Sequence, residues 1–120
     1  MVAYADEVIL NDRALTVGGW AMLKGEDSRR GHVYVVLKSA ATQKIYSTVT
    51  LLRPDVAKAY QVPGWRQSGF RAVISRDRLP AEDVEVGVIV VGSNGPEILM
   101  LPHRLTLSHG GEATAVSLRN

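Results

Sequence analysis

The chain has 120 residues, of which 46% are hydrophobic and 22% are charged, with a net charge of +2. That length suits one domain around a single core and leaves no room for a second. Cysteine is absent, which excludes disulfides, zinc–thiolate sites and a cysteine nucleophile. No apolar run approaches the roughly 18–20 residues that cross a bilayer, and the N-terminus has no signal-peptide pattern, so we expect a soluble segment without membrane insertion.

Apolar residues recur mostly at every second position, which is typical of half-buried strands. The predicted strands cover residues 5–10, 15–23, 32–38, 44–52, 70–75, 84–91, 98–101 and 104–107. In the second strand, alternation turns Leu15 and Val17 inward and points Trp20 and Met22 the other way. The third strand is predicted to be central, with Val35 and its alternate neighbours on one face and Tyr34 and Val36 on the other.

A crossover connection is predicted between residues 53 and 67. Pro54 cannot donate to a strand ladder and Asp55 favours a helix start, so the fourth strand ends there and one helical turn covers residues 56–60. Pro63 and Gly64 then open a loop that is expected to present Trp65 and Arg66.

Seven or eight short strands with regular turn signals are typical of an all-β, immunoglobulin-like β-sandwich, and a small β-barrel is the alternative. The crossover favours the sandwich, because it is too long for a tight hairpin. Residues 1–108 are predicted to form the domain and 109–120 a flexible tail, with 115–118 as an alternative edge strand.

Three short motifs carry a resemblance: Gly19-Trp20-Ala21, Arg53-Pro54-Asp55-Val56-Ala57 and Ser68-Gly69-Phe70. Their layout, over about residues 14–100, resembles small sandwich accessory domains of bacterial membrane and cell-envelope proteins. The resemblance implies a non-catalytic appendage of a longer, membrane-anchored protein, on its side outside the cytoplasm. It implies no ligand and no functional residues.

Catalytic signatures are missing from the sequence. The segment 64–69 has the wrong spacing for a serine nucleophile elbow. His32, His103 and His109 stand apart from one another, without the short spacing of metal-ligand pairs. We therefore predict no enzyme, no cofactor and no metal site.

Charged residues give two further possibilities that the sequence disfavours. Glu26 and Asp27 offer oxygen ligands for calcium but lack the spacing of a calcium loop, and the adjacent Glu82 and Asp83 do not form an acid–base pair. The arginines are interspersed with acids and have few aromatic neighbours, so we predict no nucleic-acid partner; they are Arg29, Arg30, Arg66, Arg71, Arg76 and Arg78.

Two functional classes remain. The first is an interaction domain that docks onto a protein partner or a neighbouring domain, with Trp20, Met22 and Tyr34 as interface candidates. The second is a carbohydrate-binding domain in which aromatic faces stack on sugar rings. Its candidate ligand-binding residues are Trp65, Tyr60, Arg66 and Gln67. Packing against the protein itself is the competing interpretation for both tryptophans.

Overall fold

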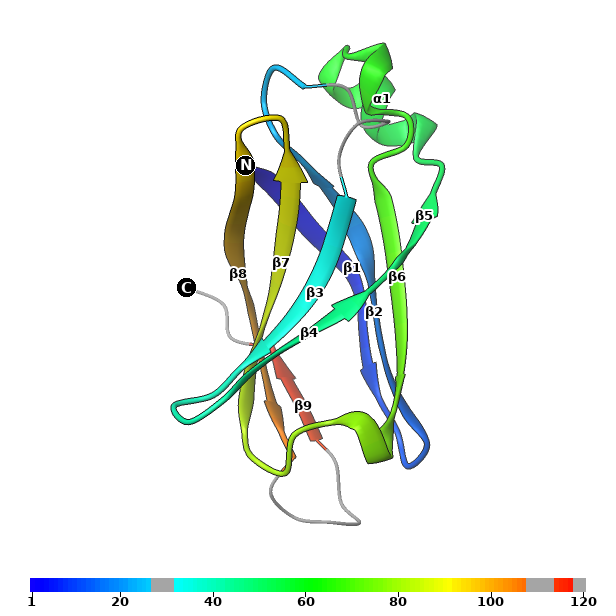
Figure 1. Cartoon of the computed structure of the whole chain (residues 1–120). Coiled ribbons are helices and arrows are strands. Elements are labelled where there is room, and N and C mark those ends of the chain that lie inside the picture. Colours follow the sequence, from blue (N-terminus) through cyan, green and yellow to red (C-terminus); the bar gives the residue numbers. More distant parts are fainter. Residues whose placement is uncertain (27–31, 108–113, 118–120) are drawn as a thin grey trace.

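The computed structural model describes residues 1–26, 32–107 and 114–117, which form two antiparallel sheets (Figure 1). Sheet A has the strand order β1 (Val2–Leu10), β2 (Ala14–Met22), β6 (Gly69–Ser75) and β5 (Val49–Leu51). Sheet B has the order β4 (Gln43–Ser47), β3 (His32–Lys38), β7 (Val84–Gly92), β8 (Gly95–Thr106) and β9 (Thr114–Ser117). Three short helical elements complete the chain: α1 (Pro54–Tyr60), η2 (Pro63–Trp65) and η3 (Arg76–Arg78).

The strand order is that of an immunoglobulin-like sandwich. Strands β1, β2, β6 and β5 take the places of strands A, B, E and D, and β3, β7 and β8 those of C, F and G. The two sheets stay open at their edges and do not close into a barrel. The predicted fold class is therefore confirmed, and the barrel alternative is wrong.

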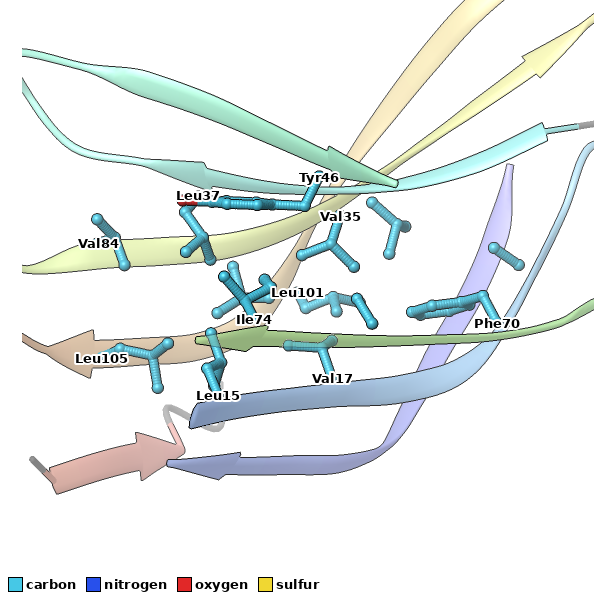
Figure 2. Packing of buried hydrophobic residues seen from close by; sticks show 14 of the residues in the cluster. Leu15, Val17, Val35, Leu37, Tyr46, Phe70, Ile74, Val84, Leu101 and Leu105 are labelled. Carbon is cyan, nitrogen blue, oxygen red and sulfur yellow. The ribbon is translucent and has the colours of Figure 1, made fainter. Parts of the chain in front are cut away.

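The core lies between the two sheets and is built by alternation along each strand. Figure 2 shows side chains of sheet A facing side chains of sheet B across this interior. Those with no exposed surface include Leu15, Val17 and Phe70 from sheet A and Val35, Leu37 and Val86 from sheet B. The predicted inward faces of residues 15–23, 32–38 and 84–91 are confirmed by this cluster.

The predicted strand 44–52 is wrong in one respect, because it is two strands in different sheets. Strand β4 pairs with β3 in sheet B, and β5 pairs with β6 in sheet A. At the change of sheet, Thr48 donates its hydroxyl to the Val33 carbonyl at 2.6 Å. That bond satisfies a backbone acceptor where the β3–β4 ladder ends. Tyr46 faces the core in β4, while Ile45 faces outward.

The C-terminal strands also differ from prediction. Pro102 and His103 do not interrupt β8, because the register shift between β7 and β8 leaves them in a bulge where proline need not donate to the ladder. The predicted flexible tail contains strand β9, which pairs with β8. The alternative prediction of an edge strand over residues 115–118 is therefore closer to the observed structure than a flexible tail. The other tail residues, and residues 27–31 of the predicted loop 24–31, lie outside the described residues.

Candidate functional site

The crossover between β5 and β6 folds back onto the outer face of sheet A and encloses a second apolar cluster. Figure 1 shows α1 at one end of the sandwich, beside the ends of β5 and β6. The buried members of the cluster are Trp20, Met22, Val56, Ala57 and Trp65. Two backbone bonds tie the crossover down, from Arg53 to the Arg66 carbonyl and from Ala21 to the Ser68 carbonyl.

Trp65 lies inside this cluster with only 5% of its surface exposed. The expected presentation of its indole face by the loop is wrong, because the 3-10 turn η2 points the ring at the sheet. Tyr60 contacts Trp65 with ring centroids 5.2 Å apart and Trp20 with centroids 5.4 Å apart. Both tryptophans therefore pack against the protein itself, as the competing interpretation predicts.

Of the four residues proposed to bind carbohydrate, the structure leaves three accessible. Tyr60 is 47% exposed, and Arg66 and Gln67, which follow Trp65 in the chain, are exposed as well. Arg66 also lines a shallow groove of about 370 Å³ between α1 and η2, together with Pro54, Ala57, Lys58, Gln61 and Pro63. Neither Tyr60 nor Trp65 lines this groove, so no aromatic face meets the polar side chains there.

Arg53 fastens the crossover to β1. Its guanidinium donates two hydrogen bonds to Asp55, at 3.0 and 2.9 Å, and a third to Asp6. Asp6 is available because the β1–β2 register shifts between Ala5 and Glu7. The hydrogen bonds from Arg53 lower the pKa of the Asp55 carboxyl below its usual value. Arg53 itself takes the helix N-cap position without a side-chain cap bond, and the hydrogen bonds of its guanidinium hold the scaffold together.

Trp20 and Met22 do not form an open surface. They point away from the main core, as alternation predicts, but α1 and η2 cover them and leave 8% and 4% exposed. Their selection as interface residues is therefore wrong for the folded chain. The physical reason is the crossover, which folds onto the side of sheet A that the sequence alone suggests is open.

Tyr34 is placed differently, on the outer face of sheet B. The register places it in a row with Ser47, Ile89 and Ile98, and the next row contains Ile45, Val36, Gly87 and Met100. Ile45 and Ile98 are 54% and 50% exposed, at the two sides of this surface. We call these two rows the sheet B patch. Antiparallel sheets usually carry polar residues on the face opposite their core, but in these two rows β3 and β7 contribute only Tyr34, Val36, Gly87 and Ile89.

The centre of the sheet B patch is flat and closely packed. A Cβ atom on Gly87 would lie 2.6 Å from the Met100 Sδ and 2.9 Å from a Val36 Cγ atom, so the methionine extends over the glycine. Val36 has no exposed surface, although it lies on the outer face. The Met100 and Val36 side chains therefore fill the centre of the patch, above Gly87.

A charged row borders the patch at one end. The register aligns Gln43, Lys38, Glu85 and Arg104 across the four strands. Arg104 donates to Glu85 at 3.3 Å, with both side chains about half exposed, so this pair adds little stability. A hollow of about 470 Å³ opens here, lined by Lys38, Ser39, Ala40, Asp83, Val84, Glu85, Met100 and Arg104.

The outer face of sheet A is less continuous. Ile9 and Val73 are exposed in one row, and Val49 and Leu51 are exposed along the edge strand. An ion pair between Arg71 and Glu7, at 3.3 Å, separates these residues, and the crossover covers the end of the face. Sheet A thus exposes more large apolar side chains than sheet B, Tyr4 among them, but they form separate groups, whereas those of sheet B lie in two adjacent rows across four strands.

Other sequence candidates are spread over the molecule. Glu26 accepts a hydrogen bond from the Ser93 backbone at 2.9 Å, so its carboxylate holds the β7–β8 turn; Asp27, Arg29, Arg30 and His109 lie outside the described residues. Arg76 donates to the Asn11 carbonyl, and Arg78 lies over the Tyr46 ring. Among the residues the structure describes, no three His, Asp or Glu side chains gather as metal ligands.

No helix in the described part of the chain is long and apolar enough to cross a membrane. The chain matches no family model, no curated protein and no solved structure. Sequence analysis selected Tyr34 as an interface candidate but missed Ile45, Ile98 and Met100. The available signal was the apolar second face of residues 32–38 and 84–91, because these three residues pair with that face from the neighbouring strands.

Proposed function

We infer that the chain is a non-catalytic interaction domain that docks onto a protein surface through the sheet B patch. One observation carries this inference: in the middle of the outer face, β3 and β7 carry two rows without charged residues, and these rows continue into the exposed Ile45 and Ile98 at their sides. A contiguous exposed apolar surface on a soluble domain marks an interaction site more often than a solvated one.

The shape of the patch favours a protein over a small molecule. Small-molecule sites are concave and enclose most of their ligand, whereas this surface is flat, with Val36 and Met100 filling the position above Gly87. A flat apolar centre bordered by a charged row has the layout of a protein interface, with an apolar core and a polar rim.

The resemblance to accessory domains agrees with this function. Its three motifs meet around the crossover, where Trp20 and Ala57 share one cluster and Gly69 lies against Leu51 and Arg53. Those residues hold the scaffold together and leave the sheet B patch free for binding. We therefore extend the proposal to an accessory domain within a longer envelope protein. The carbohydrate-binding alternative has less support, because Trp65 is buried.

Site-specific photocrosslinking tests the docking surface. A photoreactive benzoylphenylalanine replaces Ile98 in the sheet B patch or, as the matched control, Val73 on the outer face of sheet A, which is similarly exposed. After irradiation of the cells that make the protein, we expect a discrete protein adduct from position 98 that disappears when Ile45→Glu is added. Adducts from position 73 alone, or none from position 98, would contradict the proposal.

A further inference from the structure

The register of sheet B specifies a partner for its own outer face. In the outward rows, Tyr34 is paired with Ile89, Val36 with Gly87 and Lys38 with Glu85. Each pair joins unlike and complementary residues: an aromatic with an aliphatic side chain, a side chain with a position that has none, and a cation with an anion. The flanking strands add Ile45 on β4 and Met100 on β8 in one row.

From these pairs we propose that the sheet B patch binds a second copy of this chain, through a two-fold axis that runs parallel to the strands midway between β3 and β7. This proposal rests on the proposed function and names its partner. Such an axis places β3 of one copy over β7 of the other. Each β3 residue then lies over the β7 residue of the second copy that corresponds to its own cross-strand neighbour.

The contacts between β3 and β7 of the two copies pair unlike residues, and those between β4 and β8 place Ser47 over Ile98. Tyr34 lies over Ile89 of the second copy and Lys38 over its Glu85. In the row between them Val36 has no exposed surface, and Met100 extends over Gly87 of its own copy. Ile45 lies over Met100 of the second copy. The hollow that Glu85 and Arg104 help to line gives the incoming lysine room beside the carboxylate. No like charges face each other in this arrangement.

The other orientation of the two-fold axis is unfavourable. An axis across the strands would place the charged row of Lys38, Glu85 and Arg104 over the opposite end of the face, where His32, Val91 and Pro96 lie. Glu85 and Arg104 would then face Val91 and Pro96, and covering these charges without a partner is unfavourable. The charge pattern therefore selects the parallel axis.

The size of the surface sets the strength of the dimer. Four strands about 4.8 Å apart with outward rows over about 20 Å give a flat footprint of roughly 300 Å². The two facing surfaces together cover about 600 Å², below the roughly 1,200–2,000 Å² of stable specific interfaces. We therefore expect a weak, reversible dimer that forms only at high protein concentration.

Sedimentation velocity with charge-reversed variants tests the geometry. Wild type should shift from monomer to dimer between about 5 and 500 µM. Lys38→Glu and Glu85→Lys should each weaken the dimer at least about tenfold, because each places like charges opposite one another at two symmetric positions. An equimolar mixture of the two variants should dimerise again, since each altered charge then meets its opposite on the other chain.

The mixture separates contacts between copies from effects within one copy. Repulsion inside a variant chain persists after mixing, so recovery requires residue 38 to face residue 85 of the other molecule. Val73→Glu, on sheet A, is the matched control and should dimerise like wild type; circular dichroism melts show that each variant is folded. Wild type that stays monomeric, a mixture that does not recover, or dimer loss in Val73→Glu would overturn the proposal. A crosslink from position 98 to a different protein would overturn it while leaving the docking function intact.

Discussion

Replacing Trp65 by alanine separates the scaffold role of this residue from a ligand-binding role. Its side chain is 5% exposed and packs in the cluster beneath α1 and η2. Deleting a buried tryptophan costs about 3–5 kcal/mol, and this small cluster at the end of sheet A can partly relax, so we expect about 3 kcal/mol. For a domain of this size that loss lowers the Tm by about 10–15 °C.

Urea unfolding measures the loss of stability in Trp65→Ala, and tryptophan fluorescence reports whether the cover over Trp20 has loosened. The chain has two tryptophans, so Trp20 is the remaining emitter in Trp65→Ala. Its emission should move to longer wavelength as the cover provided by α1 loosens. Arg66→Ala, an exposed neighbour, should change stability by less than about 0.5 kcal/mol. A Trp65→Ala protein within about 1 kcal/mol of wild type would refute the packing account and return Trp65 to the list of ligand contacts.

Three further predictions follow from local geometry. Gly19→Ala should lower the free energy of unfolding in urea by more than about 3 kcal/mol, because its Cβ would lie 2.0 Å from the Tyr4 carbonyl oxygen. In Gly18→Ala the nearest atom to the new Cβ is the flexible end of Glu7 at 3.1 Å, so the loss should be much smaller. Equal losses in the two variants would contradict this reasoning. Burial raises the pKa of Tyr46 above its usual 10, with Arg78 opposing, so the neutral phenol stabilises the fold at and below pH 10 and this contribution is lost as pH rises further. Absorbance titration should lose its highest-pH tyrosine component in Tyr46→Phe, and loss of a component at or below pH 10 instead would be inconsistent. Arg53→Lys should raise the lowered pKa of Asp55 towards its usual value, which carbon NMR of the carboxyl can follow; an unchanged pKa would mean that Arg53 is not its cause.

Strand positions were predictable wherever alternation was strict and turn residues bounded it. Residues 32–38 were predicted with the boundaries of β3, because valines alternate across one face and charged residues flank the strand. The division of 44–52 between two sheets had no such signal. The alternation continues through Thr48, and only the tertiary arrangement decides which sheet each half joins.

The proposed docking surface was predictable in part. The apolar second face of β3 and β7 is visible in the sequence, but it fits a buried central strand as well as an exposed patch. Whether a face is covered depends on where the crossover 53–67 folds. In the structure the crossover lies over Trp20 and Met22 rather than over Tyr34. A similar ambiguity affects Trp65, because a loop tryptophan between Gly64 and Arg66 can turn outward or inward without a change in sequence pattern.

The identity of the docking face is tested most directly by following backbone amide chemical shifts as the protein concentration rises. The account predicts that shifts change along β3, β7, β4 and β8, with the largest changes around Tyr34, Gly87 and Ile98. The amides around Ile9 and Val73 in sheet A should stay constant. Changes that centre on sheet A, or shifts that stay the same at every concentration up to about 500 µM, would contradict self-association through the sheet B patch.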